Sequence, residues 1–275
     1  MTMNCFLAPL ASRDVIAVSG PDWRDFLQGL LTQDVLTLKP GGLRFAGFLT
    51  PQGRLLYDLF LAGREDGVLI DCAAEHRAAI LQKLKIHRLR AKVTLEEADT
   101  PVHALWGLDP APEGWARDPR ARGLGFRGYG APTVEGARPA TEADHDAQAF
   151  TLGLPGPADW GSDKAYPIEA NFDLLGGIDF KKGCFVGQET TSRMKRRGTV
   201  KSRMAPIAFE GPAPEASSAL LAGALRTGQV TSAREGAAMA LLRLDRLAEG
   251  DLTLEDGRPF RVVWPDWMAE VIPSA

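Results

Sequence analysis

The sequence KGCFVGQE, residues 182–189, sets a cysteine between two glycines and is the most informative stretch of the chain. The preceding GGIDFKKG (176–183) is typical of a short strand that leaves through a glycine, and the following GQETTSRMKR (187–196) can form a helix. Cys184 is therefore expected at a strand-to-helix junction. The unpaired N–H groups of a helix start, with Lys182 nearby, favour a thiolate over a thiol, so Cys184 is a candidate nucleophile or metal ligand.

A purely structural interpretation of the same residues also stands. Cys184 can be a small buried hydrophobic residue, with Gly183 and Gly187 serving only the turn. Glu189 can favour the helix dipole from the first turn and pair with Arg193 one turn later. The motif alone therefore leaves a structural and a chemical role open.

The composition bounds the class of protein. A chain of 275 residues favours more than one domain, and a formal net charge of -3 gives no overall attraction to nucleic acid or acidic membranes. Cys5, Cys72 and Cys184 are far apart, which argues against a disulfide framework and suits a reducing compartment. The sequence lacks an apolar run of bilayer length, and its opening residues lack a targeting pattern. We expect a cytoplasmic protein without a membrane partner.

The chain divides into three predicted domains. Residues 1–106 combine strands, helices and a hairpin at Thr50-Pro51-Gln52-Gly53, which predicts a mixed α+β unit with largely antiparallel pairing. Gly- and Pro-rich sequence follows, and residues 107–203 form a second α+β unit that carries KGCFVGQE. Residues 204–275 have short apolar runs separated by turns, which predicts a C-terminal β-barrel.

A basic run follows the cysteine motif. SRMKRRGTVKSR (192–203) has no acidic residue. Such a run can attract the phosphates of RNA, a cofactor phosphate or a carboxylate-rich tail, or can simply be a solvated face. Because no aromatic residue interleaves it, we do not expect direct nucleic-acid binding. Its cations are Arg193, Lys195, Arg196, Arg197, Lys201 and Arg203.

KGCFVGQE, followed by SR and RRG, resembles the Lys-Gly-Cys-(Tyr/Phe)-x-Gly-Gln-Glu signature of the YgfZ family. These are folate-binding relatives of the glycine-cleavage T-protein that act in iron–sulfur cluster assembly or maintenance. The resemblance covers most of the chain. Its further segments are SGPDWRDFLQGLLTQDV (19–35), LTPQGRLLYDLFL (49–61), YPIEANFD (166–173), GQVTS (228–232) and WPDW (264–267).

The resemblance implies a three-lobed T-protein-like fold around a central channel that accepts tetrahydrofolate or a related reduced folate. A pterin presents N–H donors that suit a carboxylate, and we choose Glu169, which can equally be an exposed loop acid. Arg193, Lys201 or Arg203 could meet the glutamate tail of the folate. Gly183, Gly187, Gln188 and Glu189 complete the expected cofactor-binding set. We expect a monomer with no permanently bound metal.

Departures from the T-protein pattern argue against ordinary aminomethyl transfer. T-proteins carry an Asp-Asp pair in the first hairpin, where this chain has Tyr57 and Asp58. Ala149 or a neighbour replaces the usual arginine before the Gly-Ile-Pro turn, and T-proteins lack the cysteine signature.

Three functions compete. The leading hypothesis is an accessory factor in iron–sulfur cluster assembly or repair, with Cys184 as a transient ligand, a sulfur acceptor or a redox-sensitive nucleophile. One cysteine cannot hold a cluster that takes four ligands, so client iron–sulfur proteins or assembly factors must supply the rest. The alternative is a tetrahydrofolate-dependent one-carbon transferase in which Asp58 orients the amine. The third is an RNA-associated protein. The expected catalytic set is Cys184, Lys182 and Asp58.

Overall fold

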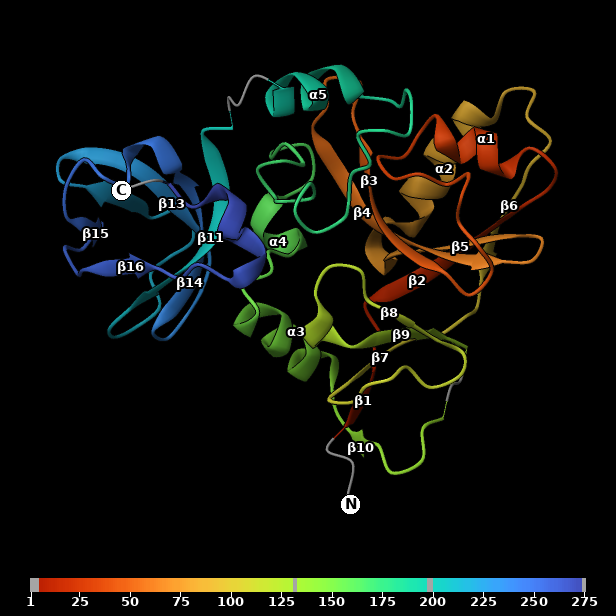
Figure 1. The fold of residues 1–275 in the computed structure, drawn as a ribbon, viewed down its shortest axis with the longest axis horizontal. Helices are drawn as coiled ribbons and strands as arrows, with labels where there is room; N and C mark the ends of the chain where they lie inside the picture. The colour runs from red at the N-terminus through yellow and green to blue at the C-terminus, as the bar shows by residue number, and fades with distance from the viewer. Residues whose placement is uncertain (1–4, 131–132, 197–199, 274–275) are drawn as a thin grey trace.

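A computed structural model describes residues 5–130, 133–196 and 200–273. Three β-sheets occupy three lobes that meet near the middle of the molecule (Figure 1). The predicted α+β fold with two mixed lobes and a C-terminal barrel is confirmed. Of the helices that the structure describes, none combines the length and the apolar character needed to cross a bilayer.

The first sheet is antiparallel throughout, in the order β3-β4-β5-β2-β6. The predicted hairpin joins β3 to β4. Apolar residues of α1 and α2 pack with one face of the sheet in a single core, and β4 is buried on both faces. The elements of this lobe are β2 (Arg13–Ser19), α1 (Trp23–Gln28), β3 (Leu43–Leu49), β4 (Leu55–Arg64), β5 (Gly67–Ala73), η1 (Ala74–His76), α2 (Arg77–Arg88) and β6 (Thr94–Ala98).

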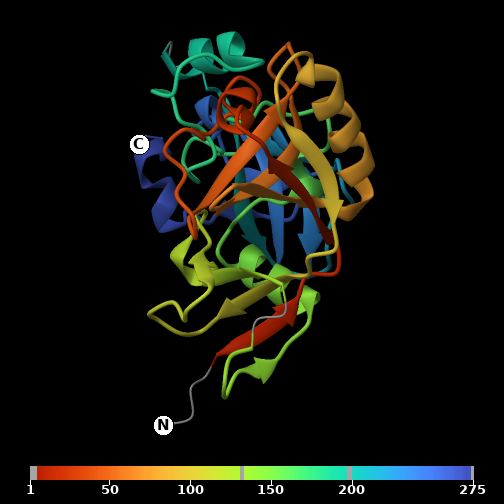
Figure 2. The ribbon, with the colours of Figure 1, turned by 90° about the vertical axis from the view of Figure 1, so that its right-hand side faces the viewer.

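The second sheet, in the order β10-β1-β7-β9-β8, takes its strands from both sides of residue 106. The first strand of the chain pairs antiparallel with β7 and parallel with β10 (Figure 2). The boundary predicted at residue 106 therefore falls inside this sheet, and the division into three domains stays a prediction. The strands are β1 (Phe6–Pro9), β7 (Val102–Trp106), β8 (Trp115–Arg117), β9 (Phe126–Tyr129) and β10 (Arg138–Pro139).

Helices and turns connect this sheet to the barrel. Helix α3 begins with a capping box, in which the Thr141 hydroxyl accepts from the Asp144 N–H and the Asp144 carboxylate accepts from the Thr141 N–H. The connecting elements are α3 (Glu142–Thr151), α4 (Pro157–Trp160) and α5 (Gln188–Arg196), whereas η2 (Arg122–Leu124) lies between β8 and β9 of the sheet itself.

The C-terminal sheet has the order β15-β12-β13-β14-β11-β16 and is antiparallel. A bridge between Thr253 and Pro259 brings its two edges together, so the sheet is a nearly closed barrel. Its elements are β11 (Ser202–Phe209), β12 (Ala219–Ala222), β13 (Leu225–Arg234), β14 (Ala237–Arg243), η3 (Leu244–Arg246), β15 (Leu252–Leu254), β16 (Phe260–Val262) and η4 (Asp266–Val271).

The segment 154–178 joins the lobes. Its aromatic residue Phe172 packs with Phe45 of β3 at a ring separation of 4.5 Å, and the same core includes Met204 and Met239 of the barrel. The first lobe and the barrel thus share one apolar core, which fixes their relative position around the central cavity described below.

Candidate functional site

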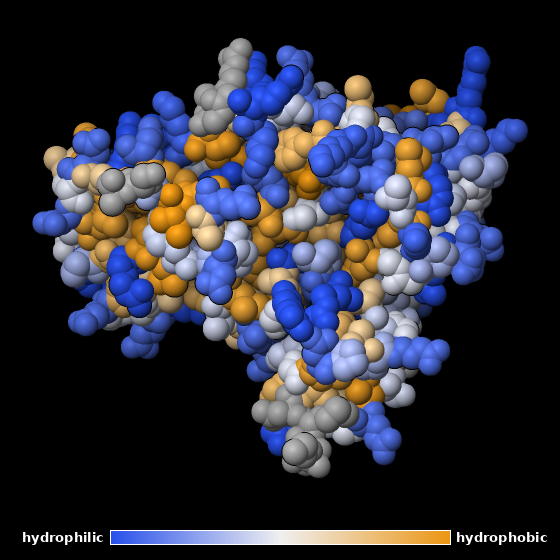
Figure 3. Space-filling view, viewed as in Figure 1, coloured by the Kyte–Doolittle hydropathy of each residue, from blue (hydrophilic) through white to orange (hydrophobic). Residues whose placement is uncertain are grey.

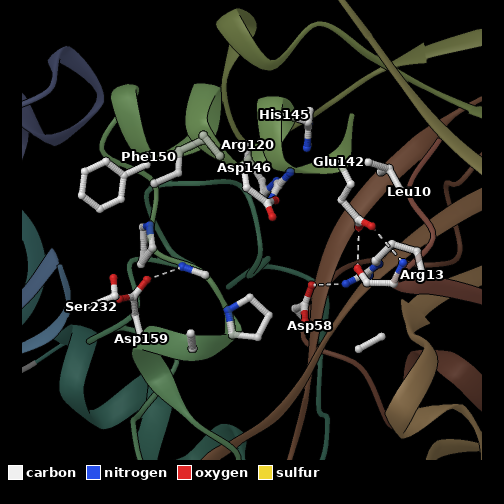
Figure 4. Close-up of a pocket in the computed structure, with 18 of the residues that line it drawn as sticks. Leu10, Arg13, Asp58, Arg120, Glu142, His145, Asp146, Phe150, Asp159 and Ser232 are labelled. Atoms are coloured by element: carbon white, nitrogen blue, oxygen red, sulfur yellow. Dashed lines mark hydrogen bonds and ion pairs between the residues drawn. The ribbon is translucent and has the colours of Figure 1, made fainter. Parts of the chain in front are cut away.

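A cavity of about 720 Å³ lies where the three lobes meet. Residues of β2, β4, α3, α4 and β13 line it, so every lobe contributes to its wall. Figure 4 shows Arg13 and Asp58 on one side, Asp159 and Ser232 across from them, and Asp146 with Arg120 between the two sides. We call this the central cavity. Its position and lining agree with the central channel that the family resemblance implies.

A buried ion network forms one wall of the central cavity. Arg13 Nη1 donates to Asp58 Oδ2 at 3.0 Å, and Arg13 Nε donates to Asp71 Oδ1 at 2.6 Å. Arg127 Nη1 and the Tyr129 hydroxyl both donate to Asp71 Oδ2, at 2.7 Å and 3.1 Å. Asp71 has no exposed surface, so its charge is balanced by these donors rather than by water.

Asp58, the predicted catalytic carboxylate, belongs to this network. Asp58 lines the cavity, but its Oδ2 already accepts from Arg13, and the side chains of both residues are less than 10% exposed. Asp58 is therefore suited to fixing the wall of the cavity and to accepting one further hydrogen bond.

One face of α3 forms the second wall. Glu142, His145, Asp146 and Ala149 recur at the spacing of a helical face, and all four line the cavity. Glu142 is held by Ser12, whose backbone N–H donates to its carboxylate at 3.0 Å. Ala149 or a neighbour is the residue that the resemblance aligns with the arginine of T-proteins, and this alignment stays a prediction.

The cavity shifts the pKa values of His145 and Asp146 in opposite directions. Burial, with the charges of Arg127 and Arg120, lowers the pKa of His145 to about 3, so its imidazole is neutral at neutral pH. Asp146 keeps more than a third of its surface accessible, yet partial desolvation and then the charge of Glu142 raise its pKa. Among the described residues, none donates a hydrogen bond to the Asp146 carboxylate. Asp146 is therefore an acid of the central cavity that is available to a ligand.

The barrel completes the cavity. Asp159 of α4 accepts from the Thr231 and Ser232 hydroxyls at 2.7 Å and 2.6 Å, which ties the second lobe to β13. Arg234, at the end of β13, lies 4.4 Å from the ring centre of Phe150. In the described part of the chain Arg234 has no ion-pair partner, so its guanidinium can meet an anionic group.

The structure places the other predicted folate contacts away from the central cavity. The Glu169 carboxylate accepts from the Tyr166 N–H at 2.9 Å, and Glu169 does not line the cavity. Arg203 is buried and donates to Asp173 at 2.9 Å from both terminal nitrogens. Arg203 therefore holds the 154–178 segment against the barrel and cannot turn to a ligand without breaking both hydrogen bonds to Asp173.

The Cys184 loop is a second, separate region. Residues 176–187 form turns rather than the predicted strand, because Ile178 and Phe185 pack into a core without pairing to another strand. Cys184 is exposed, whereas Cys5 and Cys72 are buried. Cys184 is not among the lining residues of the central cavity. An exposed thiol rules out the buried-hydrophobe interpretation.

Lys182 anchors this loop to α1. Its ammonium donates to the carbonyls of Gln28 and Leu31 at 2.5 Å and 2.6 Å, and Gln28 Nε2 donates back to the Lys182 carbonyl at 3.0 Å. The Val186 N–H donates to the Gly29 carbonyl at 3.1 Å. Burial lowers the pKa of Lys182 to about 8. Lys182 thus positions the loop, and a direct role beside the Cys184 sulfur stays a prediction.

Glycines shape the turn on each side of the thiol. Gly183 and Gly187 have φ values of +91° and +80°. A Cβ atom at Gly187 would lie 2.6 Å from the Thr50 carbonyl oxygen, so this position requires glycine. Gln188 Nε2 donates to the Gly183 carbonyl at 2.9 Å, which ties the start of α5 to the loop.

Helix α5 carries the basic run beyond the loop. Glu189, together with Gln188, Ser192, Lys195 and Arg196, lines a groove of about 470 Å³ over Phe180. Lys195 also forms an ion pair with Asp173 at 3.3 Å. Two predicted tail contacts, Arg193 and Lys201, are exposed outside the central cavity. The remaining member of the run, Arg197, lies outside the described residues.

Within residues 5–130, 133–196 and 200–273, the structure has no group of three or more His, Cys, Asp or Glu side chains arranged to hold a metal ion. A metal at Cys184 would need ligands from another molecule.

Comparison with known proteins identifies the family. Residues 201–270 match the family model described as the CAF17 C-terminal β-barrel domain. The iron–sulfur cluster assembly factor IBA57 of Mus musculus is 30% identical, over 96% of this chain and 85% of the relative. The chain belongs to the IBA57 family. The IBA57 homologue of Neurospora crassa is 35% identical, over 76% of this chain and 55% of the relative.

This IBA57-family chain spans little more than half the length of the first fungal relatives that it matches. The fold is also that of the glycine cleavage system aminomethyltransferase T from Bartonella henselae, with a TM-score of 0.79, 17% identity and coverage of 96% of this chain and 86% of that chain. The relatives are named as mitochondrial proteins. This finding contradicts the prediction of a cytoplasmic protein, which depended on the absence of a targeting pattern.

Several residues of the central cavity were not predicted from the sequence. The spacing of Glu142, His145 and Asp146 on one helical face could have indicated them. Arg13, Asp159 and Arg234 gave no such indication, because their place in the cavity depends on contacts between lobes.

Proposed function

We propose that this IBA57-family protein, with a YgfZ-type signature, is a folate-binding factor in iron–sulfur cluster assembly or repair, and that Cys184 supplies a thiolate outside the folate cavity. The observation that carries the proposal is an exposed Cys184 on a loop fixed to α1, in a chain whose relatives are named iron–sulfur cluster assembly factors. Thiolate is a soft ligand that suits iron–sulfur clusters.

Cys184 supplies only one ligand, so an iron–sulfur cluster bound to it would be shared with another protein. A cluster normally takes four protein ligands, and the described residues bring no second cysteine to this surface. A client or carrier protein must therefore supply the other ligands. Exposure of the thiol and of the neighbouring loop gives such a protein access to the sulfur.

The residues of the central cavity fit a reduced folate. A volume of about 720 Å³ lies within the range of small-molecule sites. Asp146 is a free carboxylate that can accept the paired N–H donors of a pterin, and Arg234 is a free cation for the glutamate tail. Apolar side chains, including Phe150 and Leu154, also line the cavity. Bound folate would supply a one-carbon carrier, and the protein would orient it.

Binding is better supported than aminomethyl transfer. The carboxylate at the position of the T-protein pair, Asp58, is neutralised by Arg13, and its neighbour is Tyr57. The carboxylate that would activate an amine is therefore already engaged in an ion pair. A folate can still be held by Asp146, which the network leaves free.

The central test uses a strain that lacks the protein. Cys184→Ser is expected to abolish recovery of iron–sulfur enzyme activities, while the purified variant keeps wild-type affinity for 5-formyltetrahydrofolate. Cys72→Ala, at a buried cysteine, serves as the control variant. Full recovery by Cys184→Ser would remove the thiolate from the proposal, and a lack of folate binding by the wild-type protein would remove the cofactor.

A further inference from the structure

The end of α2 and the segment that follows it carry a dense group of cations. The sequence KLKIHRLRAK (83–92) contains no acidic residue, and none occurs between Glu75 and Glu96. Arg77, at the start of the helix, pairs with Asp14 and Glu97. In the part of the chain that the structure describes, the later cations of this stretch have no ion-pair partner. These are Lys83, Lys85, Arg88, Arg90 and Lys92.

Two aliphatic side chains protrude among these cations. Residues 85–90 are all exposed, with Leu89 at 88% and Ile86 at 64%. The other large hydrophobic residues exposed in the described chain stay below 50%. The preceding turns anchor the helix, since Ile80 and Leu84 are fully buried. Figure 3 shows apolar and hydrophilic side chains standing out together at the upper right corner, over α2.

The backbone at Leu89 is strained. Leu89 caps the C-terminal end of α2 with φ +45°, in the region that favours glycine or asparagine. A leucine here gains neither packing nor a relaxed backbone. An exposed apolar side chain kept in a strained conformation indicates a role outside the fold. We call residues 83–92 the basic tip.

We propose that the basic tip binds the surface of an anionic lipid bilayer, with Ile86 and Leu89 entering the interface and the cations meeting lipid phosphates. Stable attachment to a membrane surface requires two contributions, and the tip combines apolar insertion with a cluster of Lys and Arg of the size that recognises anionic lipid. Surface binding needs no membrane-spanning helix. The proposal is independent of the proposed function and revises the expectation of no membrane partner.

Other polyanions fit the tip less well. A nucleic acid would use the cations but has no use for two protruding aliphatic side chains, and the exposed residues 85–90 include no aromatic residue other than His87 for base stacking. The ring of His87 is already packed edge-on to Phe48, with 6.3 Å between ring centres. The aliphatic pair is therefore the feature that separates a lipid surface from RNA.

The test is flotation of the full chain with vesicles. Vesicles of phosphatidylglycerol and phosphatidylcholine should carry the protein at low salt and lose it as salt rises, whereas phosphatidylcholine alone should not bind it. Arg88→Gln with Arg90→Gln should lower partitioning about 30-fold. Leu89→Gly should lower it about tenfold by removing the apolar side chain, and this variant relieves the strained backbone, so it should fold.

A matched variant controls for general loss of charge and apolar surface. Leu225→Gly with Arg226→Gln alters an exposed Leu-Arg pair on the barrel and should leave partitioning unchanged. The proposal fails if anionic vesicles do not bind the wild-type protein, or if the barrel variant loses as much as the tip variants. Binding to tRNA that weakens in Arg88→Gln with Arg90→Gln but not in Leu89→Gly, without vesicle binding, would assign the tip to nucleic acid.

Discussion

The central cavity and the Cys184 loop are built by opposite means. Charged side chains of the first two lobes pair in the cavity wall, and Asp71 joins two arginines without solvent. The Cys184 loop depends on backbone carbonyls and one lysine, and it leaves its sulfur in solvent. A rigid interior wall suits retention of a small molecule, while an anchored surface loop suits exchange with another protein. Damage to one region should therefore leave the other intact.

The largest expected effect comes from Asp71→Asn. This change leaves Arg13 and Arg127 buried without their shared acid and should lower the free energy of unfolding by about 3–5 kcal/mol in urea titrations. Asp245→Asn, in an exposed pair with Arg243, should change it little. Equal losses in the two variants would show that the buried network contributes no more to stability than an exposed ion pair.

Asp146→Asn tests the cavity without touching its ion network. Loss of the charged acceptor should weaken binding of 5-formyltetrahydrofolate by about 10- to 100-fold, measured by calorimetry. Because the pKa of Asp146 is raised, affinity should also fall as the pH drops through that value in the wild type only. Glu249→Gln, at an exposed acid of the barrel, is the control. Unchanged affinity in Asp146→Asn would show that Asp146 does not contact the pterin.

Lys182→Met tests the loop. The variant keeps the aliphatic stem but loses the hydrogen bonds to the Gln28 and Leu31 carbonyls, which should cost about 1–2 kcal/mol of stability. It should also reduce recovery of iron–sulfur enzyme activities in the deletion strain. Folate affinity should stay at the wild-type level. Lys181→Met, at the exposed neighbour, should behave as wild type. A loss of folate binding in Lys182→Met would show that the Cys184 loop and the central cavity depend on each other, contrary to the separation described above.

The last expected effect is a dependence of stability on pH. His145 has a pKa of about 3 in the folded chain, against an ordinary value of 6.5, so the unfolded chain binds more protons between these values. The free energy of unfolding should therefore fall as the pH drops below about 6.5, by up to about 1.4 kcal/mol per pH unit. His145→Gln should show a shallower dependence in urea titrations at pH 7 and pH 5. Parallel curves would contradict a neutral, buried His145.

The fold was predictable because the motifs that carry the resemblance are local in sequence. The three-lobed arrangement followed from them, and Asp58 lies in the central cavity as the hairpin motif implied. The strand expected at 176–183 does not form, because its apolar residues pack into a core from a turn. A short apolar run gives no information about whether a partner strand is available.

The charged residues were harder to place. Arg203 belongs to a basic run, yet it is buried against Asp173, and Glu169 lies at a local turn. Conversely, Arg13 meets Asp58 across 45 positions of the chain. Which acid neutralises which base depends on contacts between distant segments, and residue type alone does not reveal them.

The pairing of β1 with β10 constrains how this protein is made. Phe6 pairs in parallel with Arg138, which lies far along the chain and is synthesised much later. Until then one edge of β1 has no neighbour and is open to pairing with other nascent chains. We infer that the interval before β10 emerges is the period when this protein most needs a chaperone.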